Sequence, residues 1–423
     1  MVPPSCLMIR VARALRVGGE RGRYFTTSQV SRRGPFDVLF CGSDAFSVGS
    51  LKAVLEATDV WKSIHVLTPD VQVIGRGGRK VGGARQVYKC ELMSFAEENG
   101  LTLSTLSSVK TVESHQQSRG PTAEKTALKP SSSRWTPPTP FDQHDDSHLL
   151  LTASFGHIIP NSLLDKFSPP HRLNVHPSLL PKYRGAAPIQ WTIINGDKST
   201  AISVQRLVER GKGIDAGDIV GVRDNIDVPQ DATFPFMMQA LAPMGGELLV
   251  KTLREIIAGT SIARPQDSAL TTRAPKVDKE TSRARFSQQS ALTINRLHRA
   301  LSHNHSIWTE VNGLHVQLLD PKYVPLSTTL SVVSEKTEDL HPGTAWLDKS
   351  SEGRSQRILI ACAPLEEDLG ALPNSDRQEH LTWLEVRTVK PKGKKEMPVK
   401  EWWNGLSHDV KVRNRVVLDA TPA

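Results

Sequence analysis

Residues 174–189 have the sequence Asn-Val-His-Pro-Ser-Leu-Leu-Pro-Lys-Tyr-Arg-Gly-Ala-Ala-Pro-Ile, and the fold of the chain is organised around them. The stretch begins in apolar surroundings, and residues two apart on a strand point to the same face, so Asn174 and His176 are predicted to share a site. Three prolines then interrupt any helix or central strand, and Gly185-Ala186-Ala187 has no bulk. A strand that ends in a loop of fixed shape, open to close approach, is therefore predicted.

These residue types suit the transfer of an acyl group. The Asn174 amide offers N–H donors to an oxygen that gains negative charge, and the His176 imidazole can move a proton near neutral pH. The segment Gly213-Ile-Asp-Ala-Gly-Asp218 adds a carboxylate, Asp215, in a turn bracketed by glycines. A strand-end Asn and His that only bond to a loop are the simpler interpretation of Asn-x-His alone, and the loop that follows favours the catalytic one.

The stretch 174–189, together with Gly213–Asp218, resembles the folate-dependent formyltransferases, and Arg184-Gly-Ala-Ala-Pro-Ile is similar to the methionyl-tRNA formyltransferase branch of that family. The resemblance implies an α/β fold, with a Rossmann-like parallel-sheet domain followed by a smaller OB-like β-barrel. It implies transfer of the formyl group of 10-formyltetrahydrofolate, a co-substrate, to the methionyl amino group of initiator methionyl-tRNA. Asn174, His176 and Asp215 would be catalytic, no metal would be needed, and a monomer is expected.

The resemblance also implies a folate site. Phe155-Gly156-His157-Ile158-Ile159-Pro160 is similar to the family's Tyr-Gly-x-Ile-x-Pro loop, whose backbone faces the pterin ring. His157 matches a position without a catalytic role in the family. The residues expected to bind folate are Phe155, Gly156, Ile158, Ile159, Ser178, Leu179, Leu180 and Pro181.

Two basic segments are candidates for contact with RNA. The Gly-rich loop 75–85 carries several positive side chains, and composition alone leaves a phosphate-binding loop and a solvated surface loop equally open. The resemblance implies that Arg76, Arg79 and Lys80 contact the acceptor end of the tRNA. Near the C-terminus, Lys392, Lys394 and Lys395 are expected to follow the RNA backbone, with a solvated charged loop as the alternative.

Composition sets the wider frame. The 423 residues carry a net charge of +9, which favours a polyanionic partner such as RNA or arises in part from a targeting peptide. Residues 1–33 are rich in arginine with Glu20 as the single acid, and between 7 and 17 they have the pattern of a basic amphipathic helix, which predicts a mitochondrial transit peptide and a location in the mitochondrial matrix. The cysteines lack metal-ligand or disulfide spacing, and no apolar run is long enough to cross a bilayer.

The catalytic domain is predicted to span residues 36–258, beginning with a strand, a helix and a second strand in a βαβ arrangement. Residues 148–156 form a continuous apolar run suited to the centre of a parallel sheet. A helix is expected from about 237 to 258, starting past Pro235, with early turns broken by Pro243 and Gly245-Gly246. Residues 104–146 are polar and expected to be mostly disordered, with an insertion at about 107–140.

After a polar linker at 259–280, residues 281–410 are predicted to hold one short helix and several strands, which suits an OB-like barrel that binds tRNA. Two other functions remain open. Another 10-formyltetrahydrofolate-dependent formyltransferase or hydrolase would share Asn174, His176 and Asp215 without needing the basic segments. A non-catalytic RNA-binding protein fits the charge and the barrel, but does not require the three polar residues.

Overall fold

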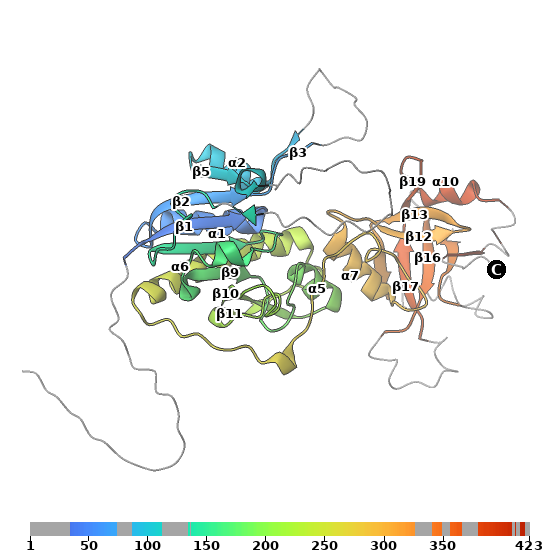
Figure 1. The fold of residues 1–423 in the computed structure, drawn as a ribbon. Coiled ribbons are helices and arrows are strands. Elements are labelled where there is room, and N and C mark those ends of the chain that lie inside the picture. The colour runs from blue at the N-terminus through green and yellow to red at the C-terminus, as the bar shows by residue number, and fades with distance from the viewer. Residues whose placement is uncertain are drawn as a thin grey trace, which may run out of the picture. The chain divides into compact units, whose positions relative to one another are not determined.

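The computed structural model describes residues 34–73, 87–111, 134–135, 137–325, 341–348, 356–365, 380–407, 411 and 415–418. Its first domain is built on a seven-stranded sheet with the order β11-β10-β9-β8-β1-β2-β5 (Figure 1). The strands are β1 (Phe36–Gly42), β2 (Trp61–Thr68), β5 (Thr102–Thr105), β8 (His148–Ala153), β9 (Arg172–His176), β10 (Ser199–Arg206) and β11 (Ile219–Asp227). The predicted α/β class of this domain is confirmed.

The sheet is parallel from β9 to β5 and antiparallel at its other edge. All six residues of β8 are buried, as the continuous apolar run 148–153 requires of a strand covered on both faces. The chain moves from β1 outward through β2 to β5, then returns to the other side of β1 to form β8 and β9. The order therefore reverses between β1 and β8, and the carboxyl ends of parallel strands at such a reversal form a crevice that commonly binds ligands.

Helix α1 (Ala45–Glu56) packs closely against α6 (Phe234–Ile257). A Cβ on Gly246 would lie 2.6 Å from the Cβ of Ala53, so the glycine lets the two helices approach. The expectation that α6 starts past Pro235 and is broken near Pro243 is wrong, since the helix is continuous from Phe234. Pro235 occupies the first turn, where its missing N–H has no helical partner to lose, and burial of the glycines against α1 stabilises the rest.

The prediction of disorder across 104–146 is wrong at both ends of that segment. Leu106 is buried, and Phe141 is fully buried and stacked on Phe167 with ring centroids 5.7 Å apart. Each places an apolar side chain in a small core beneath the sheet, which offsets the entropy lost on ordering. Residues 112–133, most of the expected insertion at 107–140, lie outside the described residues.

Shorter elements complete the first domain and connect its strands. The helices are α2 (Glu91–Glu98), α3 (Leu106–Val109), α4 (Asn161–Leu164) and α5 (Pro188–Asn195), with 3-10 turns η1 (Pro169–His171) and η2 (Ser268–Leu270). Two-residue strands pair as β3 (Gln72–Val73) with β4 (Val87–Tyr88) and as β6 (Lys110–Thr111) with β7 (Arg134–Trp135).

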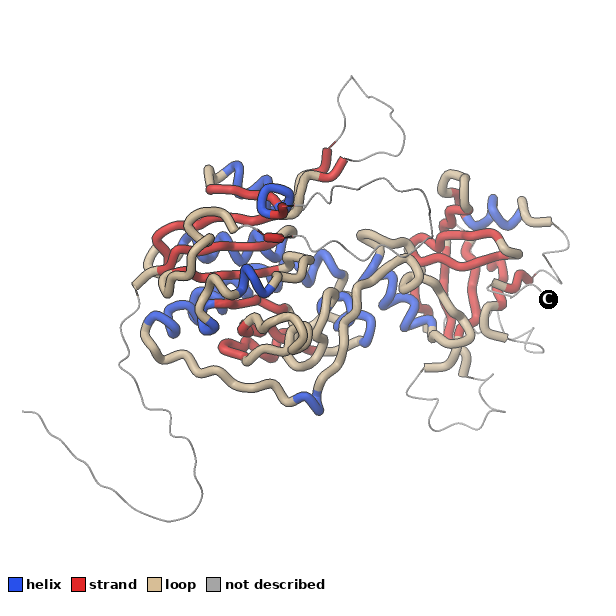
Figure 2. The backbone as a smooth tube through the Cα atoms, in the orientation of Figure 1, coloured by secondary structure: helices blue, strands red, loops and turns tan. Residues whose placement is uncertain are grey.

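In its described residues, the C-terminal domain has helix α7 (Ala291–Leu301), two antiparallel sheets, and helix α10 (Val399–Asn404) between the last two strands, as Figure 2 shows in red and blue. One sheet has the order β12-β13-β18-β19 and the other β14-β17-β16-β15-β20. Their strands are β12 (Ile307–Val311), β13 (Leu314–Leu319), β14 (Lys322–Val324), β15 (Thr344–Asp348), β16 (Arg357–Cys362), β17 (Thr382–Val386), β18 (Thr388–Pro391), β19 (Met397–Pro398) and β20 (Arg415–Val417). The prediction of a β-rich second domain is confirmed.

Helix α7 has an apolar face made by Ile294, Leu297 and Leu301, and this face is buried. Ser290 caps its start by accepting a hydrogen bond from the Thr293 N–H. Among the described residues, none of the helices combines the length and the apolar character needed to span a membrane.

Candidate active site

A cavity of about 550 Å³ opens at the carboxyl ends of β1, β8 and β9. Asn174, His176 and Asp215 all line it, so the three residues predicted to act together do meet at one place. The wall is completed by the loop after β8, by the loop between β10 and β11, and by the first turns of α6. Its position matches the reversal of strand order, where a ligand site is expected.

The two neighbours of β9 hold Asn174 in one orientation. On β8, the Thr152 hydroxyl donates to Asn174 Oδ1 at 2.7 Å. Because that oxygen is the acceptor, the amide nitrogen must point the other way, and it lies 3.4 Å from Asp215 Oδ1. On the opposite side, Gln205 of β10 is the direct cross-strand partner of Asn174. The amide of Asn174 therefore presents its N–H groups to the cavity.

Asp215 is held by neutral donors. Gln205 Nε2 donates to Oδ1 at 2.7 Å, and the Gly185 N–H donates to Oδ2 at 2.9 Å. The Asp215 backbone has a φ of 52°, an uncommon conformation that Asp tolerates better than most residues. Gln266 bonds the same turn from outside, donating to the Asp215 carbonyl at 2.9 Å and the Gly217 carbonyl at 2.7 Å.

Position 185 requires a glycine. Its φ of 129° lies in a region that favours glycine, and a Cβ there would lie 2.5 Å from the Ala274 carbonyl oxygen. Its N–H is thereby free to meet the Asp215 carboxylate. The bulk-free Gly-Ala-Ala segment thus has the expected function of close backbone approach.

His176 is buried, and its two ring nitrogens face different partners. Nε2 lies 2.9 Å from the Tyr183 carbonyl oxygen. A carbonyl can only accept, so Nε2 carries a hydrogen and Nδ1 is the nitrogen that gains or loses a proton. Nδ1 lies 3.8 Å from Asp215 Oδ2, beyond hydrogen-bond distance but close enough for attraction between charges.

Tyr183, whose carbonyl fixes the His176 ring, is itself fixed at its other end. Its hydroxyl donates to Asp197 Oδ2 at 2.7 Å and accepts from Asn195 Nδ2 at 2.9 Å. Burial, together with the nearby Asp197 carboxylate, raises the pKa of Tyr183 to about 12, so the donating hydroxyl keeps its proton. Tyr183 belongs to the 174–189 stretch, so the loop that follows the catalytic strand also sets the tautomer of its histidine.

The residues expected to bind folate divide into two groups. Phe155, Gly156, Ile158 and Ile159 line the cavity, and Ile158 is largely exposed at 62% of its surface. Ser178, Leu179, Leu180 and Pro181 do not line it. Ser178 and Leu180 are buried inside the loop, where Ser203 Oγ donates to the Ser178 carbonyl at 2.8 Å and accepts from the Leu180 N–H at 3.2 Å. The structure gives Ser178 and Leu180 a role in holding the loop, and contact with a ligand stays a prediction for all four residues.

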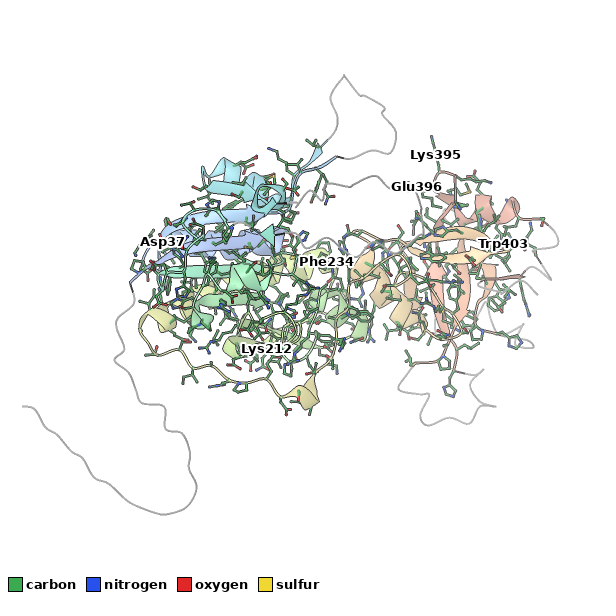
Figure 3. The ribbon with its side chains drawn as sticks, viewed as in Figure 1. Asp37, Lys212, Phe234, Lys395, Glu396 and Trp403 are labelled. Atoms are coloured by element: carbon green, nitrogen blue, oxygen red, sulfur yellow. The ribbon has the colours of Figure 1, made fainter. Side chains whose placement is uncertain are left out.

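Only some of the residues expected to bind tRNA lie in the part of the chain that the structure describes. Arg76, Arg79 and Lys80 lie outside the described residues. Lys392, Lys394 and Lys395 are all exposed in the turn between β18 and β19. Figure 3 labels Lys395 and Glu396 at the outer edge of the C-terminal domain, with the Lys395 side chain pointing outward.

Sequence reasoning missed several residues of the site. Thr152 and Gln205 are set by strand pairing that residue patterns do not reveal, and Gln266 comes from the linker 259–280, far from the site in sequence. Asp44 caps the start of α1 and also lines the cavity, a position that its place in the sequence does not reveal. Among the described residues, no group of three or more His, Cys, Asp or Glu side chains is arranged to hold a metal ion.

Family profiles match both domains of this chain. The sequence profile described as "Formyl transferase" matches residues 110–253, and the profile "Formyl transferase, C-terminal domain" matches residues 276–407. The N-formyltransferase of Helicobacter canadensis, solved with folinic acid and dTDP-3-aminofucose, is 13% identical with a TM-score of 0.48, over 83% of this chain and 99% of that one.

Curated relatives are nearer in sequence. The methionyl-tRNA formyltransferase of Acidobacterium capsulatum is 29% identical over 375 residues, which cover 87% of this chain and 96% of the relative. That of Agathobacter rectalis is 30% identical over 288 residues, which cover 68% and 80% respectively. Similarity of this degree across both domains, with a cavity lined by Asn174, His176 and Asp215, shows that the chain is a formyl-transferring enzyme and belongs to the methionyl-tRNA formyltransferase family.

Proposed function

We propose that this enzyme transfers the formyl group of 10-formyltetrahydrofolate to the methionyl amino group of initiator methionyl-tRNA. The observation that carries the proposal is the arrangement of Asn174, His176 and Asp215 in one cavity, in a chain whose relatives bear the name methionyl-tRNA formyltransferase. The amine attacks the formyl carbon, and the carbonyl oxygen becomes an oxyanion in a tetrahedral intermediate.

Asn174 stabilises that oxyanion. The bond from Thr152 fixes which end of the amide faces the cavity, so the N–H donors are in place before the reaction begins. One N–H is directed toward Asp215 at the long distance of 3.4 Å, and the other is available to the oxygen. Loss of one such donor from an oxyanion site costs about 2.7 to 4 kcal/mol of activation free energy.

His176 moves the proton at Nδ1. With Nε2 donating to the Tyr183 carbonyl, a second proton on the ring can reside only on Nδ1, which faces Asp215. The Asp215 carboxylate also attracts a water that can relay a proton from the attacking amine to the leaving folate nitrogen. Because Gln205 and Gly185 hold the carboxylate without neutralising it, its negative charge stays available.

The folate occupies the part of the cavity lined by the loop after β8. Phe155 and Ile159 supply apolar surface there, and Gly156, with a φ of 72°, leaves the backbone open to a flat ring. A pocket that combines apolar walls with a few polar groups suits a pterin, which needs stacking surface and backbone hydrogen bonds. The folinic acid bound by the Helicobacter canadensis enzyme is a property of that protein.

The tRNA would be held by the two basic segments named above, Arg76, Arg79 and Lys80 in one and Lys392, Lys394 and Lys395 in the other. The enzyme would act as a monomer in the mitochondrial matrix, which the arginine-rich residues 1–33 support by their composition. A fluorescent protein fused to residues 1–33 should accumulate in mitochondria, and cytosolic fluorescence would contradict the location.

The function is tested by incubating the purified chain with 10-formyltetrahydrofolate and charged initiator tRNA. Formylmethionine released from the tRNA should be detected by mass spectrometry in amounts equal to the folate consumed. Charged elongator methionyl-tRNA is the matched control, and it should be formylated more slowly. Consumption of folate with formate as the product would instead identify a hydrolase, and no consumption with tight RNA binding would identify a non-catalytic RNA-binding protein.

A further inference from the structure

Asp44 is a charged group on the wall of the reactive cavity that the mechanism above does not use. It follows β1 and directly precedes α1, and it lines the same cavity as Asn174 and His176. We propose that Asp44 is the base that takes the first proton from the α-ammonium group of the aminoacyl acceptor. This inference rests on the proposed function, because it assigns a residue to the acceptor of that reaction.

The sheet places Asp44 opposite the catalytic strand. β1 pairs with β8, and β8 pairs with β9, so Cys41 of β1 lies level with Asn174 two strands away, and Asp44 comes three residues later, just past the end of β1. Strands two apart are separated by about 10 Å. Asp44 and Asn174 both line the cavity that spans this gap.

The ends of β1 and β8 are tied together at this point. Ser43 Oγ donates to the Ser154 carbonyl at 2.6 Å, and a hydrogen bond from the Ser154 side chain acts on the Asp44 carboxylate. These residues flank the reversal of strand order, where α/β folds bind ligands. Asp44 is therefore held at the expected ligand position and does not extend into solvent.

The charge of Asp44 is only partly compensated. Oδ1 accepts from the N–H groups of Phe46 at 3.1 Å and Ser47 at 3.2 Å, which caps α1. The carboxylate of Glu91, also an acid, repels the negative charge of Asp44. Burial, as the largest cause, raises the pKa of Asp44. A cation docking beside it would relieve this cost, and the acceptor of the reaction arrives as a cation near neutral pH.

The neighbouring wall is apolar. Phe234 and Met238 lie one turn apart on α6, and both face the cavity with partly exposed side chains. Gly49 of α1 lies against Ala242 of α6, and one turn later Ala53 lies against Gly246, so the two helices run side by side in the same direction. One turn earlier, Met238 therefore lies beside the start of α1. An apolar wall next to one carboxylate matches an aminoacyl group with an uncharged side chain and a charged amine.

The wall is supported from the C-terminal domain. The Phe234 ring stacks on His303 with centroids 4.0 Å apart, and Arg299 donates to the Ala232 carbonyl at 2.6 Å. Figure 3 labels Phe234 at the start of α6, on the side of the first domain nearest α7. The domain expected to hold the tRNA thus contacts the wall expected to receive its aminoacyl end.

Asp44 takes the first of the three protons on the ammonium nitrogen. One N–H bond of the ammonium breaks, an O–H bond forms on Asp44, and the electron pair stays on nitrogen and attacks the formyl carbon. A second proton leaves the nitrogen in the tetrahedral intermediate and passes through His176 to the folate nitrogen, while the third remains on the formamide. Asp44 returns its proton to solvent after the products leave.

Asp44→Asn is the decisive variant, because Asn caps a helix as well as Asp does and cannot take the proton. In the native enzyme, carboxylate plus ammonium carries the same number of protons as acid plus amine, so Asp44 adds no pH dependence to kcat/KM near neutrality. In the variant the amine must arrive unprotonated. Its kcat/KM should therefore fall about tenfold for each pH unit below the pKa of the amine, ordinarily about 7.7 to 8.0.

The measurement is the ratio of kcat/KM between native enzyme and Asp44→Asn from pH 6 to pH 8.5, with charged initiator tRNA. The ratio removes titrations common to both proteins, and the other charged or titratable residues of the cavity, present in both, are His157, His176, Arg206, Glu209, Arg210 and Asp215. It should exceed about 10 at pH 6.5 and fall toward 1 at pH 8.5. Glu91→Gln is the matched control, since Glu91 is exposed and does not line the cavity, and its ratio should stay near 1 throughout.

A ratio near 1 at every pH would overturn the assignment. A loss that is the same at every pH, with a lowered melting temperature, would show that Asp44 only caps α1 and would also overturn it. Failure of the native enzyme to formylate the charged tRNA would refute the proposed function itself, which the native arm reveals before any variant is compared.

Discussion

Two carboxylate sites in this molecule are held in opposite ways. In the first domain, Asp215 accepts from the Gln205 amide and the Gly185 backbone, both of which are neutral. In the C-terminal domain, Arg357 bonds to Asp348 at 2.8 Å and to Glu385 at 2.5 Å, and a second arginine adds a further bond to Glu385. Both sites are largely buried, so burial alone does not distinguish them.

The two sites differ in whether the negative charge of the carboxylate is neutralised. Arginine neutralises a carboxylate and leaves little field for another group, so the C-terminal cluster is suited to joining β15, β16 and β17. Neutral donors position a carboxylate without cancelling its charge, so Asp215 can still attract the proton on His176. The kind of donors that hold a carboxylate thus decides whether its charge is available to a neighbouring group.

The largest effect is expected on stability, from Arg357→Met. Removing the arginine leaves Asp348 and Glu385 buried without their shared partner, and their side chains are only 2% and 10% exposed. The free energy of unfolding should fall by about 3 to 5 kcal/mol in urea titrations. Arg387→Met is the control, because that side chain is 45% exposed and should cost far less. Equal losses in the two variants would remove the distinction between the clusters.

Asp215→Asn should act mainly on turnover. Asn keeps the size of the side chain but loses the charge that favours a proton on His176, so kcat should fall at least ~100-fold in single-turnover formylation assays. Binding of folate and tRNA should change little. Near native turnover would remove Asp215 from the mechanism and show that it only shapes its turn.

Gln205→Met probes the neutral donor itself. The variant removes the 2.7 Å bond to Asp215 Oδ1, and hydrogen bonds to charged groups contribute about 1.5 to 3 kcal/mol, so turnover should fall by roughly 10-fold or more. Gln266→Met is the control, because Gln266 bonds backbone carbonyls of the turn instead of the carboxylate. A larger loss of turnover in Gln266→Met would mean that the shape of the turn matters more than the carboxylate's orientation.

The smallest effect is expected on the free energy of unfolding at acid pH, from Glu385→Gln. Burial tends to raise the pKa of Glu385, but hydrogen bonds from Arg357 and Arg387 outweigh it and hold that pKa below the ordinary 4.5. A lowered folded-state pKa contributes stability that is present above about 4.5 and is lost as pH falls through the folded value. The difference in unfolding free energy between the native protein and Glu385→Gln should therefore shrink as pH is lowered from 5 to 3. A constant difference would contradict the pairing.

Sequence reasoning grouped Asn174, His176 and Asp215, which the structure places in one cavity. The spacing of Asn174 and His176 on a strand placed both on one face, and the glycine-bracketed turn correctly indicated where Asp215 reaches them. Local patterns of this kind are predictable because strand alternation and glycine conformations are properties of the backbone. The continuous helix α6 was not predicted, because the contact of Gly246 with α1 that stabilises it is long-range.

The chain alone determined the residue types of the site, the βαβ start of the first domain and the presence of a second, β-rich domain, because these follow from periodicity and composition read along the backbone. Only the tertiary structure decided which neighbours tune those residues. Thr152 orients Asn174, the Tyr183 carbonyl selects the His176 tautomer, and Asp44 is brought into the same cavity by pairing of β1 with β8. Such contacts depend on the relative placement of distant strands, which no local pattern encodes.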